Sequence, residues 1–221
     1  MKLTDNIYSY IWRGIWENNA NMYYFAEPLN ILFDPGMKYL FDVQIERLLD
    51  DGIKSDKIHY VINTHCHPDH FEASVNFTSS SVKIGMHKEE IAFYAETRGQ
   101  VSKTLNMDLP EIAFNMPLEE GPLTINETEL QLYHTPGHTP GSLSIYWPEK
   151  KALVCGDTLF DHSYGRKDLP GNDYGQLFES IKKLQKLDVE YLLPGHMAVI
   201  IGKFNVEERL REAAENFAMY V

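Results

Sequence analysis

Short runs of branched and aromatic residues recur along the chain, and stretches with helical spacing lie between them. Runs that end at turn-forming residues predict β-strands. These strands cover residues 7–12, 21–26, 30–33, 58–63, 82–86, 123–125, 129–134, 142–147, 151–155 and 191–193. Apolar residues three or four positions apart predict helices. The helices cover residues 39–50, 68–77, 87–95 and 175–187, and a last helix has Asn205 as its predicted N-terminal cap.

Strand pairs and helices occur in both halves of the chain. This order is typical of an α+β fold in which two sheets are covered by outer helices. No repeat or long linker separates the halves, so residues 1–221 are expected to form a single domain. Residues 96–121 have the least regular pattern although they are rich in apolar side chains. This segment is expected to be a lid over a site, a contact between two copies of the chain, or a cover of the core.

Acidic side chains dominate the composition. The 221 residues include 32 Asp and Glu against 20 Lys and Arg, a formal net charge of -12. This charge repels phosphate backbones and anionic lipids, so we expect a small-molecule substrate and neither nucleic acid nor membrane as partner. Two cysteines and the absence of a signal-peptide or membrane-spanning apolar run predict a cytoplasmic protein. Self-association into a homo-oligomer is left open.

Three histidines and an aspartate lie within six residues, where a predicted strand passes into a predicted helix. They are His65, His67, Asp69 and His70. Imidazole nitrogen and carboxylate oxygen are ligands that suit zinc, iron or manganese. Crowding these groups together without a metal would be costly if they were buried. The cluster therefore predicts a metal site.

Residues of the same ligand types follow three further predicted strands. His138 lies after 129–134 in a loop fixed by two prolines and two glycines, Asp157 follows 151–155, and His196 follows 191–193. A single histidine or aspartate after a strand is usually a turn or cap residue. Loops at strand ends on a rigid scaffold are, however, where functional sites are built. Four strand ends that each carry such residues favour one shared site.

The ordered set His65-x-His67-x-Asp69-His70, His138, Asp157 and His196 resembles the metallo-β-lactamase-fold hydrolase superfamily over residues 30–196. Residues 135–142, 156–160 and 165–171 look most like the glyoxalase II group, and the persulfide dioxygenases share much of this pattern. The resemblance implies an αββα sandwich, in which two mixed β-sheets are flanked by outer helices and the site lies along one edge of the sheets.

The resemblance also implies two divalent metal ions per chain, zinc first, with iron or manganese as alternatives. The first ion would be held by His65, His67 and His138, and the second by Asp69, His70 and His196, with Asp157 as a bridge. Such a site stays net positive after the two aspartates and a bridging hydroxide are counted, so it would lower the pKa of bound water. Asp69 is expected to orient this hydroxide and to pass a proton to the leaving group.

Four further residues are expected near the site. Asp34 and His134 are candidates to orient metal ligands, although Asp34 before Pro35 is equally suited to a turn. Tyr164 and Arg166 are candidates for substrate contact. The alternative is that Arg166 pairs with Asp168 and only holds its loop.

Three functions are compatible with these residues. The first is a dinuclear hydrolase that uses a metal-bound bridging hydroxide to cleave a small thioester, ester or lactone. The second is a mononuclear iron oxygenase of the persulfide dioxygenase kind, and the third is a non-catalytic binding module that has kept the fold. Metal content separates them, because they predict two equivalents, one iron and almost no metal, respectively.

Overall fold

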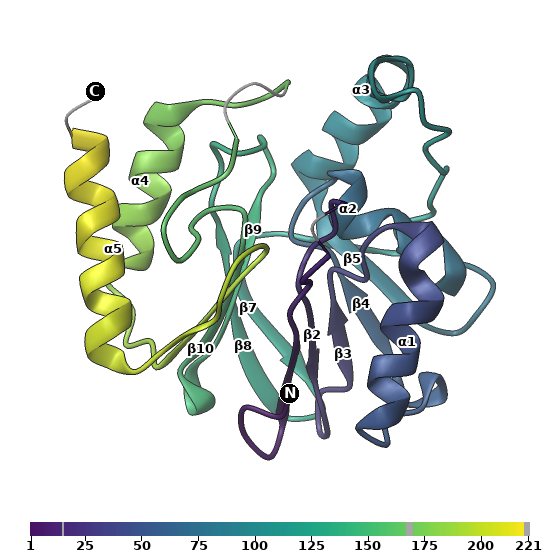
Figure 1. The fold of residues 1–221 in the computed structure, drawn as a ribbon, viewed down its shortest axis with the longest axis horizontal. Helices are drawn as coiled ribbons and strands as arrows, with labels where there is room; N and C mark the ends of the chain where they lie inside the picture. The colour runs from purple at the N-terminus through teal and green to yellow at the C-terminus, as the bar shows by residue number, and fades with distance from the viewer. Residues whose placement is uncertain (15, 167–169, 219–221) are drawn as a thin grey trace. The chain divides into compact units, whose positions relative to one another are not determined.

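A computed structural model describes residues 1–14, 16–166 and 170–218, which divide into two compact units, Met1–Leu118 and Glu119–Val221 (Figure 1). Each unit contains one six-stranded mixed β-sheet and its own helices. The predicted α+β class with two mixed sheets is confirmed. The assignment of residues 1–221 to a single domain stays a prediction.

The first sheet has the strand order β1-β2-β3-β4-β5-β6. The first three strands pair antiparallel, and β3 through β6 pair parallel. The strands are β1 (Ile7–Tyr10), β2 (Met22–Phe25), β3 (Ile31–Phe33), β4 (Tyr60–Ile62), β5 (Lys83–His87) and β6 (Met116–Leu118). Parallel strands need long connections, and the connection from β4 to β5 holds the predicted histidine cluster.

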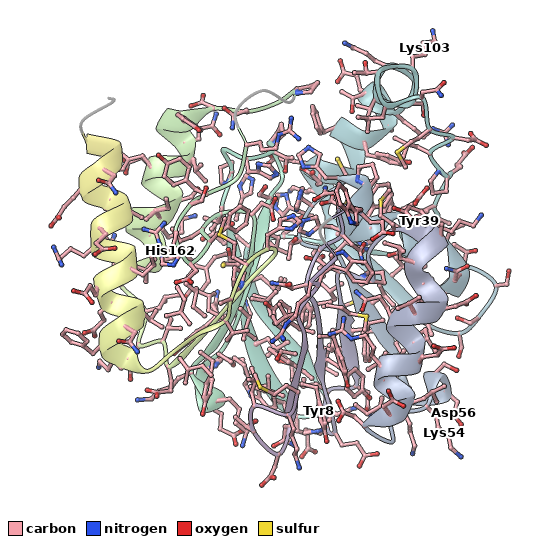
Figure 2. All side chains as sticks on the ribbon, in the orientation of Figure 1. Tyr8, Tyr39, Lys54, Asp56, Lys103 and His162 are labelled. Atoms are coloured by element: carbon pink, nitrogen blue, oxygen red, sulfur yellow. The ribbon has the colours of Figure 1, made fainter. Side chains whose placement is uncertain are left out.

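Three helices of the first unit pack on one face of its sheet. They are α1 (Phe41–Asp50), α2 (Pro68–Phe71) and α3 (Lys88–Leu105). The unit also has three short 3-10 helices. One precedes α1 (Lys38–Leu40), one precedes β4 (Ser55–Lys57), and one follows α2 (Glu72–Phe77). Leu48, Phe71 and Tyr94 bring the helices into one core with side chains of β1 to β5. Tyr39, just before α1, and Lys103, near the end of α3, are exposed (Figure 2).

The second sheet has the strand order β12-β11-β10-β9-β8-β7. Only β10 and β11 pair parallel among these neighbours. The strands are β7 (Gly121–Ile125), β8 (Thr128–His134), β9 (Leu143–Trp147), β10 (Ala152–Gly156), β11 (Tyr191–Pro194) and β12 (Ile200–Ile201), and the turn Pro148–Lys150 joins β9 to β10. The loops after β8, β10 and β11 carry His138, Asp157 and His196.

Two helices, α4 (Tyr174–Leu184) and α5 (Lys203–Ala218), lie side by side in the second unit (Figure 1). Leu177 and Ile181 of α4 and Leu210 of α5 share one core with β9 to β12. Asp173 caps α4, because its Oδ1 accepts the backbone N–H of Gln176 at 3.0 Å.

Several predicted boundaries were wrong. The helix predicted at 87–95 continues to Leu105, and the rest of the irregular segment packs in the first core through Leu109 and Ile112, so it covers the core. The predicted cap Asn205 lies inside the last helix, which begins at Lys203, and its Nδ2 donates to the carbonyl of Ile201 at 2.8 Å. The short strands β6 and β12 were missed, because three and two residues carry no periodicity. Among the described residues no helix has the length and apolarity needed to cross a membrane.

Candidate metal centre

In the first unit, β4 runs into a five-residue loop that ends at Pro68, the first residue of α2. Proline suits this first helical position because it has no backbone N–H to leave unpaired. His65 and His67 lie in the loop, and Asp69 and His70 lie in the first turn of the helix. His65 and His70 are fully buried, so their ring nitrogens need defined partners.

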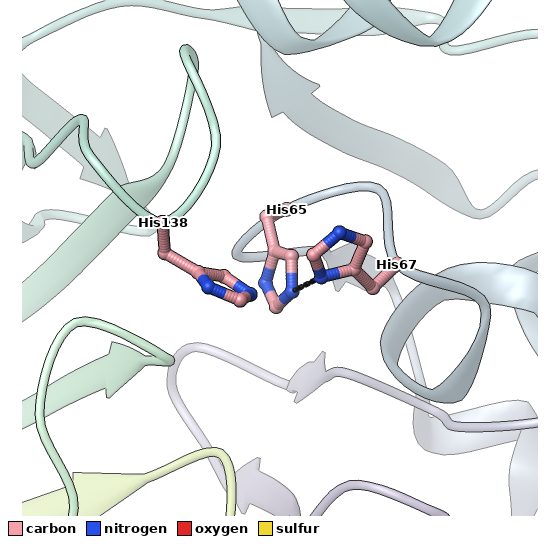
Figure 3. A group of neighbouring side chains, drawn as sticks. All are labelled: His65, His67 and His138. Carbon is pink, nitrogen blue, oxygen red and sulfur yellow. Dashed lines mark hydrogen bonds between the residues drawn. The ribbon is translucent and has the colours of Figure 1, made fainter. Parts of the chain in front are cut away.

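The rings of His65 and His67 converge. Nε2 of His65 lies 3.0 Å from Nδ1 of His67, and the rings meet edge to face (Figure 3). Two nitrogens bound to one tetrahedral zinc at 2.0–2.1 Å are separated by about 3.3–3.4 Å. The observed separation is slightly shorter than this, so the two nitrogens fit one shared metal ion when both are unprotonated.

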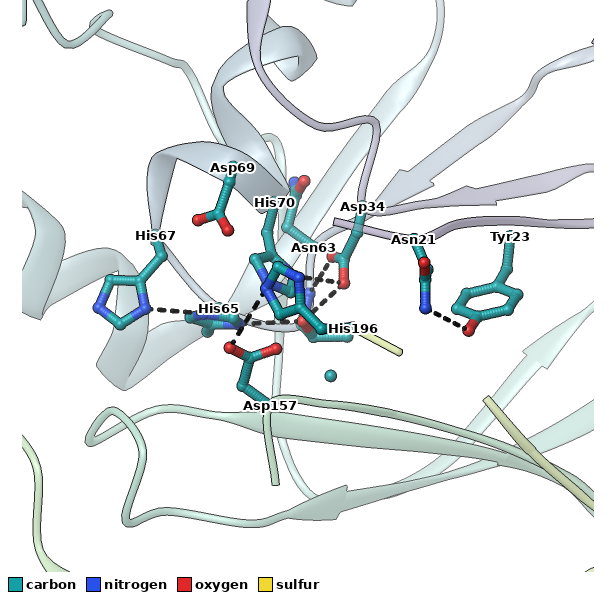
Figure 4. Close-up of polar contacts among 12 residues, drawn as sticks. Asn21, Tyr23, Asp34, Asn63, His65, His67, Asp69, His70, Asp157 and His196 are labelled. Carbon is teal, nitrogen blue, oxygen red and sulfur yellow. Dashed lines mark hydrogen bonds and ion pairs between the residues drawn. The ribbon is translucent and has the colours of Figure 1, made fainter. Parts of the chain in front are cut away.

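Asp34 determines which nitrogen of two imidazoles is available as a ligand (Figure 4). Its Oδ2 accepts Nδ1–H of His70 at 2.9 Å and the hydroxyl of Thr64 at 2.8 Å. Because the only Thr64 hydroxyl proton is used there, its oxygen must accept Nδ1–H of His65, 3.1 Å away. Both histidines therefore keep Nε2 as the lone-pair nitrogen, as metal ligation requires.

The Asp34 carboxylate also holds the loop backbone. Oδ1 accepts the N–H of Thr64 at 2.8 Å. Asp34 itself has φ of 47°, in the left-handed region that non-glycine residues enter uncommonly, asparagine and aspartate more often than most. Such strain persists where the surroundings over-determine it, and it clusters at functional sites.

Cys66 points away from its histidine neighbours. Its side chain belongs to the core of the first unit, and its backbone N–H donates to Oε1 of the buried Glu90 on α3 at 2.8 Å. Burial, with the Glu90 carboxylate beside it, raises the pKa of the Cys66 thiol well above its ordinary value. A neutral thiol in this position is a core residue, as is Cys155 in the second unit.

Asn18 was not predicted from the sequence. Its Nδ2 donates to Oδ2 of Asp69 at 2.7 Å, and the backbone N–H of Ala20 donates to the Asp69 carbonyl at 2.9 Å. Asn19 between them anchors the segment, because its Oδ1 accepts the N–H of Met37 at 2.7 Å. The loop between β1 and β2 thus fixes one oxygen of the candidate catalytic carboxylate.

In the second unit, one carboxylate oxygen faces two imidazoles. Oδ2 of Asp157 lies 3.4 Å from Nε2 of His138. It also lies 3.7 Å from Nε2 of His196 (Figure 4). The second distance is too long for a hydrogen bond. Both distances resemble the separations between ligands of a common metal ion. The arrangement suits a carboxylate shared by two metal positions.

Buried hydroxyl groups fix the loop that holds His138. Thr139 Oγ1 lies 2.7 Å from the hydroxyl of Ser142, and Thr135 Oγ1 lies 2.9 Å from that of Ser144. Nε2 of His134 lies 2.8 Å from the carbonyl oxygen of Pro140 in the same loop. His134 therefore contacts the loop that holds His138.

The predicted substrate residues lie in the loop after Asp157. The Tyr164 ring meets Tyr174 at 5.9 Å, nearly perpendicular, and packs against the second core. Arg166 is exposed, and its carbonyl accepts Nδ2 of Asn172 at 3.2 Å. Asp168, the predicted alternative partner of Arg166, lies outside the described residues.

The family model of the metallo-beta-lactamase superfamily matches residues 16–196. The chain belongs to this superfamily. All seven candidate metal ligands lie inside the matched range, whereas α5 lies beyond it. The resemblance inferred from the ligand pattern is confirmed.

Two protein relatives of this superfamily member cover most of its length. A probable metallo-hydrolase of Methanocaldococcus jannaschii is 34% identical over 187 residues, which is 80% of this chain and 87% of that protein. The hydroxyacylglutathione hydrolase GloC of Haemophilus influenzae is 30% identical over 190 residues, 82% of this chain and 86% of that protein. The predicted likeness to the glyoxalase II group is confirmed.

Two solved structures share its fold. The B3 metallo-beta-lactamase BLEG-1 gives a TM-score of 0.73 at 27% identity and covers 91% of this chain and 95% of its own. The protein TTHA1623, solved in a di-iron-bound form, gives a TM-score of 0.69 at 27% identity and covers 89% and 94%. The metallo-beta-lactamase fold predicted from the sequence is confirmed.

The metallo-beta-lactamase fold implies divalent metal binding, and the donor groups of this chain fit that requirement. Each unit contributes imidazoles, at least one of them buried, and a buried carboxylate, the ligand types that zinc, iron and manganese accept. In the first unit, hydrogen bonds to Asp34 and Thr64 orient two of these imidazoles, the outer arrangement typical of metal-bound histidine.

Proposed function

We propose that the protein is a dinuclear metal-dependent hydrolase of a small thioester, ester or lactone. His65, His67 and His138 would hold one divalent ion, and Asp69, His70 and His196 the other. The observation that carries this proposal is the placement of Asp157 Oδ2 beside both His138 and His196, which suits a shared ligand. Zinc is the first candidate metal, and iron or manganese the alternatives.

Bound divalent ions would supply Lewis acidity and lower the pKa of a coordinated water. Hydrolysis joins the oxygen of water to the acyl carbon and expels a thiolate or alkoxide, so a proton must move from water to the leaving group. Asp69 is the proposed carrier of that proton. Since Asn18 holds Oδ2 of Asp69, Oδ1 is the oxygen proposed to receive and return the proton.

The substrate class rests on chemistry and on the relatives. A hydroxyacylglutathione hydrolase is 30% identical over most of the chain, which supports a thioester of a small acyl group. The net charge of -12 supports a small-molecule substrate over nucleic acid or an anionic membrane. Tyr164 and Arg166 are the proposed substrate contacts, because they follow Asp157 in the same loop.

Elemental analysis of protein purified without added metal is the first test. Two equivalents of metal per chain, with hydrolysis of a hydroxyacylglutathione thioester, an aryl ester or a lactone, are expected. Asp69→Asn is expected to lower the rate constant at least about 100-fold, the usual contribution of a general acid or base. Asp56→Asn, at an exposed position (Figure 2), is the matched control.

Three results would contradict the proposal. Unchanged hydrolysis by metal-loaded Asp69→Asn would remove the assigned role of Asp69. One iron per chain, with oxygen uptake on a persulfide, would favour a dioxygenase. A folded chain that takes up almost no metal on titration would favour a non-catalytic binding module.

A further inference from the structure

A buried arginine of the C-terminal helix holds the loop that follows Asp157. Nε of Arg209 donates to the carbonyl of Phe160 at 2.8 Å, and Nη2 donates to the carbonyl of Ser163 at 2.9 Å. Arg209 is only 8% exposed. These two bonds therefore replace the hydrogen bonds to water that its guanidinium loses on burial. The planar guanidinium presents its donors in a fixed fork, which fixes both carbonyls together.

The same loop touches every candidate metal ligand of the second unit. It begins at Asp157, and the N–H of Gly165 returns to the Asp157 carbonyl at 2.9 Å. The Phe160 ring meets the His196 imidazole edge to face, with centroids 5.4 Å apart. A Cβ on Gly165 would collide with Nδ1 of His138, so the loop backbone lies directly against that ring.

We infer that Arg209 is a positioning residue for the metal ligands of the second unit. By fixing the carbonyls of Phe160 and Ser163, it sets where the Phe160 ring supports His196 and where the loop closes on Asp157. The inference rests on the proposed function, because it takes His138, Asp157 and His196 as ligands. It assigns a role in the metal centre to α5, which lies beyond the part of the chain that matches the superfamily.

The test is titration of the metal-free full-length protein with Co²⁺, followed by visible absorption and by competition with a chelator. Arg209→Met is expected to weaken at least one of the two Co²⁺ equivalents about 10- to 100-fold, the usual effect of losing a residue that orients a ligand. Arg211→Met is the matched control on the same helix. Arg211 is exposed and pairs within its own helix with Glu215 at 2.9 Å and Glu208 at 4.0 Å, so the Co²⁺ affinities of Arg211→Met are expected to equal those of the wild type.

A second variant separates positioning from a general loss of stability. Phe160→Leu removes the ring beside His196 and leaves Arg209 unchanged. If Arg209 acts through that ring, the double variant Arg209→Met/Phe160→Leu binds Co²⁺ with about the affinity of whichever single variant binds it more weakly. A merely structural role lowers the melting temperature and leaves the Co²⁺ affinities and absorption of the folded protein at wild-type values.

The outcomes are distinct. Wild-type Co²⁺ binding by folded Arg209→Met, while wild type binds two equivalents, overturns the inference and leaves the proposed function in place. If Arg209→Met does not fold, the single variants Arg209→Lys and Phe160→Leu take its place. Wild-type Co²⁺ binding by both of them overturns the inference and leaves the proposed function in place. A wild-type protein that binds no Co²⁺ overturns both.

Discussion

Asp34 shows how one carboxylate prepares two imidazoles for the same task. Its bond to His70 is direct, and its bond to His65 passes through the Thr64 hydroxyl. In both rings the proton is held on Nδ1, so Nε2 is left to bind metal. The sequence placed Asp34 either in a turn or near the site. In the structure Asp34 follows β3 with a left-handed backbone, and its carboxylate hydrogen-bonds Thr64 of the ligand loop and His70.

Asn18 provides the sharpest activity prediction at this scale. Asn18→Ala removes the amide that fixes Oδ2 of Asp69, a bond to a charged group worth roughly 1.5–3 kcal/mol. We expect kcat/KM to fall about 10- to 100-fold with metal content retained. Steady-state kinetics with elemental analysis measures this, and Glu17→Gln on the same loop is the control. Wild-type kcat/KM in Asn18→Ala would show that Asp69 needs no such support.

Tyr24 provides a prediction for alkaline pH. Its hydroxyl donates to Oδ1 of Asn30 at 2.8 Å, the residue is 2% exposed, and burial raises its pKa from 10.0 to about 12. Between these values the unfolded chain loses the proton and the folded chain keeps it, so the free energy of unfolding falls as pH rises through this window. Denaturant titrations from pH 9 to 12 should show a shallower fall in Tyr24→Phe. An identical slope in both proteins would contradict this assignment.

At the scale of elements, the ligands lie on loops that neighbouring elements hold. The loop after β8 is docked on α4, where Nδ2 of Asn172 donates to the Gly137 carbonyl at 2.9 Å and the N–H of Asp173 does so at 2.8 Å. The loop after β10 is held by α5, and the loop after β4 by α3 through Glu90. Each of these three ligand loops therefore depends on a helix distant in sequence.

Two glycines test this dependence. Gly165→Ala places a methyl group against the His138 ring and 2.6 Å from the Asp157 carbonyl, so the loop must move. We expect loss of at least one metal equivalent. Gly99→Ala lies in α3 with nothing within 4 Å of the new methyl group, and it should keep both equivalents and stabilise the protein by about 0.5–1 kcal/mol. Elemental analysis and thermal unfolding of both variants provide the comparison. Full metal content in Gly165→Ala would show that the loop tolerates the shift.

The sequence predicted the strand ends that carry candidate ligands better than it predicted the residues that hold those ligands in place. His65, His67, Asp69 and His70 are close in sequence, so their spacing is itself a signal. Asn18 and Asp69 are 51 residues apart, and an asparagine opposite an aspartate belongs to no motif. The contacts of Arg209 lie 46 and 49 residues away, and its helix showed only an amphipathic pattern. Such contacts depend on how elements distant in sequence pack together, and a single sequence carries no local signal for that packing.

For the whole molecule, we expect bound metal to be a stabilising partner, because the net charge is -12 and most candidate ligands are buried. A ligand that binds only the folded chain adds about 2.7 kcal/mol at 100 times its dissociation constant. For a protein of this size, removing that contribution lowers the melting temperature by roughly 5–10 °C.

Calorimetry with and without a chelator measures the effect of metal on the whole chain. The melting temperature of the wild type is expected to fall by this amount on chelation and to recover when zinc is added back. Asp157→Asn, which weakens the proposed shared ligand, should show a smaller difference between the two conditions. An equal difference in both proteins would mean that the stabilising metal binds elsewhere.

The superfamily match ends at His196, and α5 begins seven residues later. A gene shortened to the matched range would still encode all seven ligands. It would lack Val206, Leu210 and Ala213 of the second core, and Arg209. The superfamily model would still match such a product over its whole range, although the product lacks the helix that we infer organises three of its ligands. For this protein, we therefore expect a match to the family model to be a weaker criterion than function.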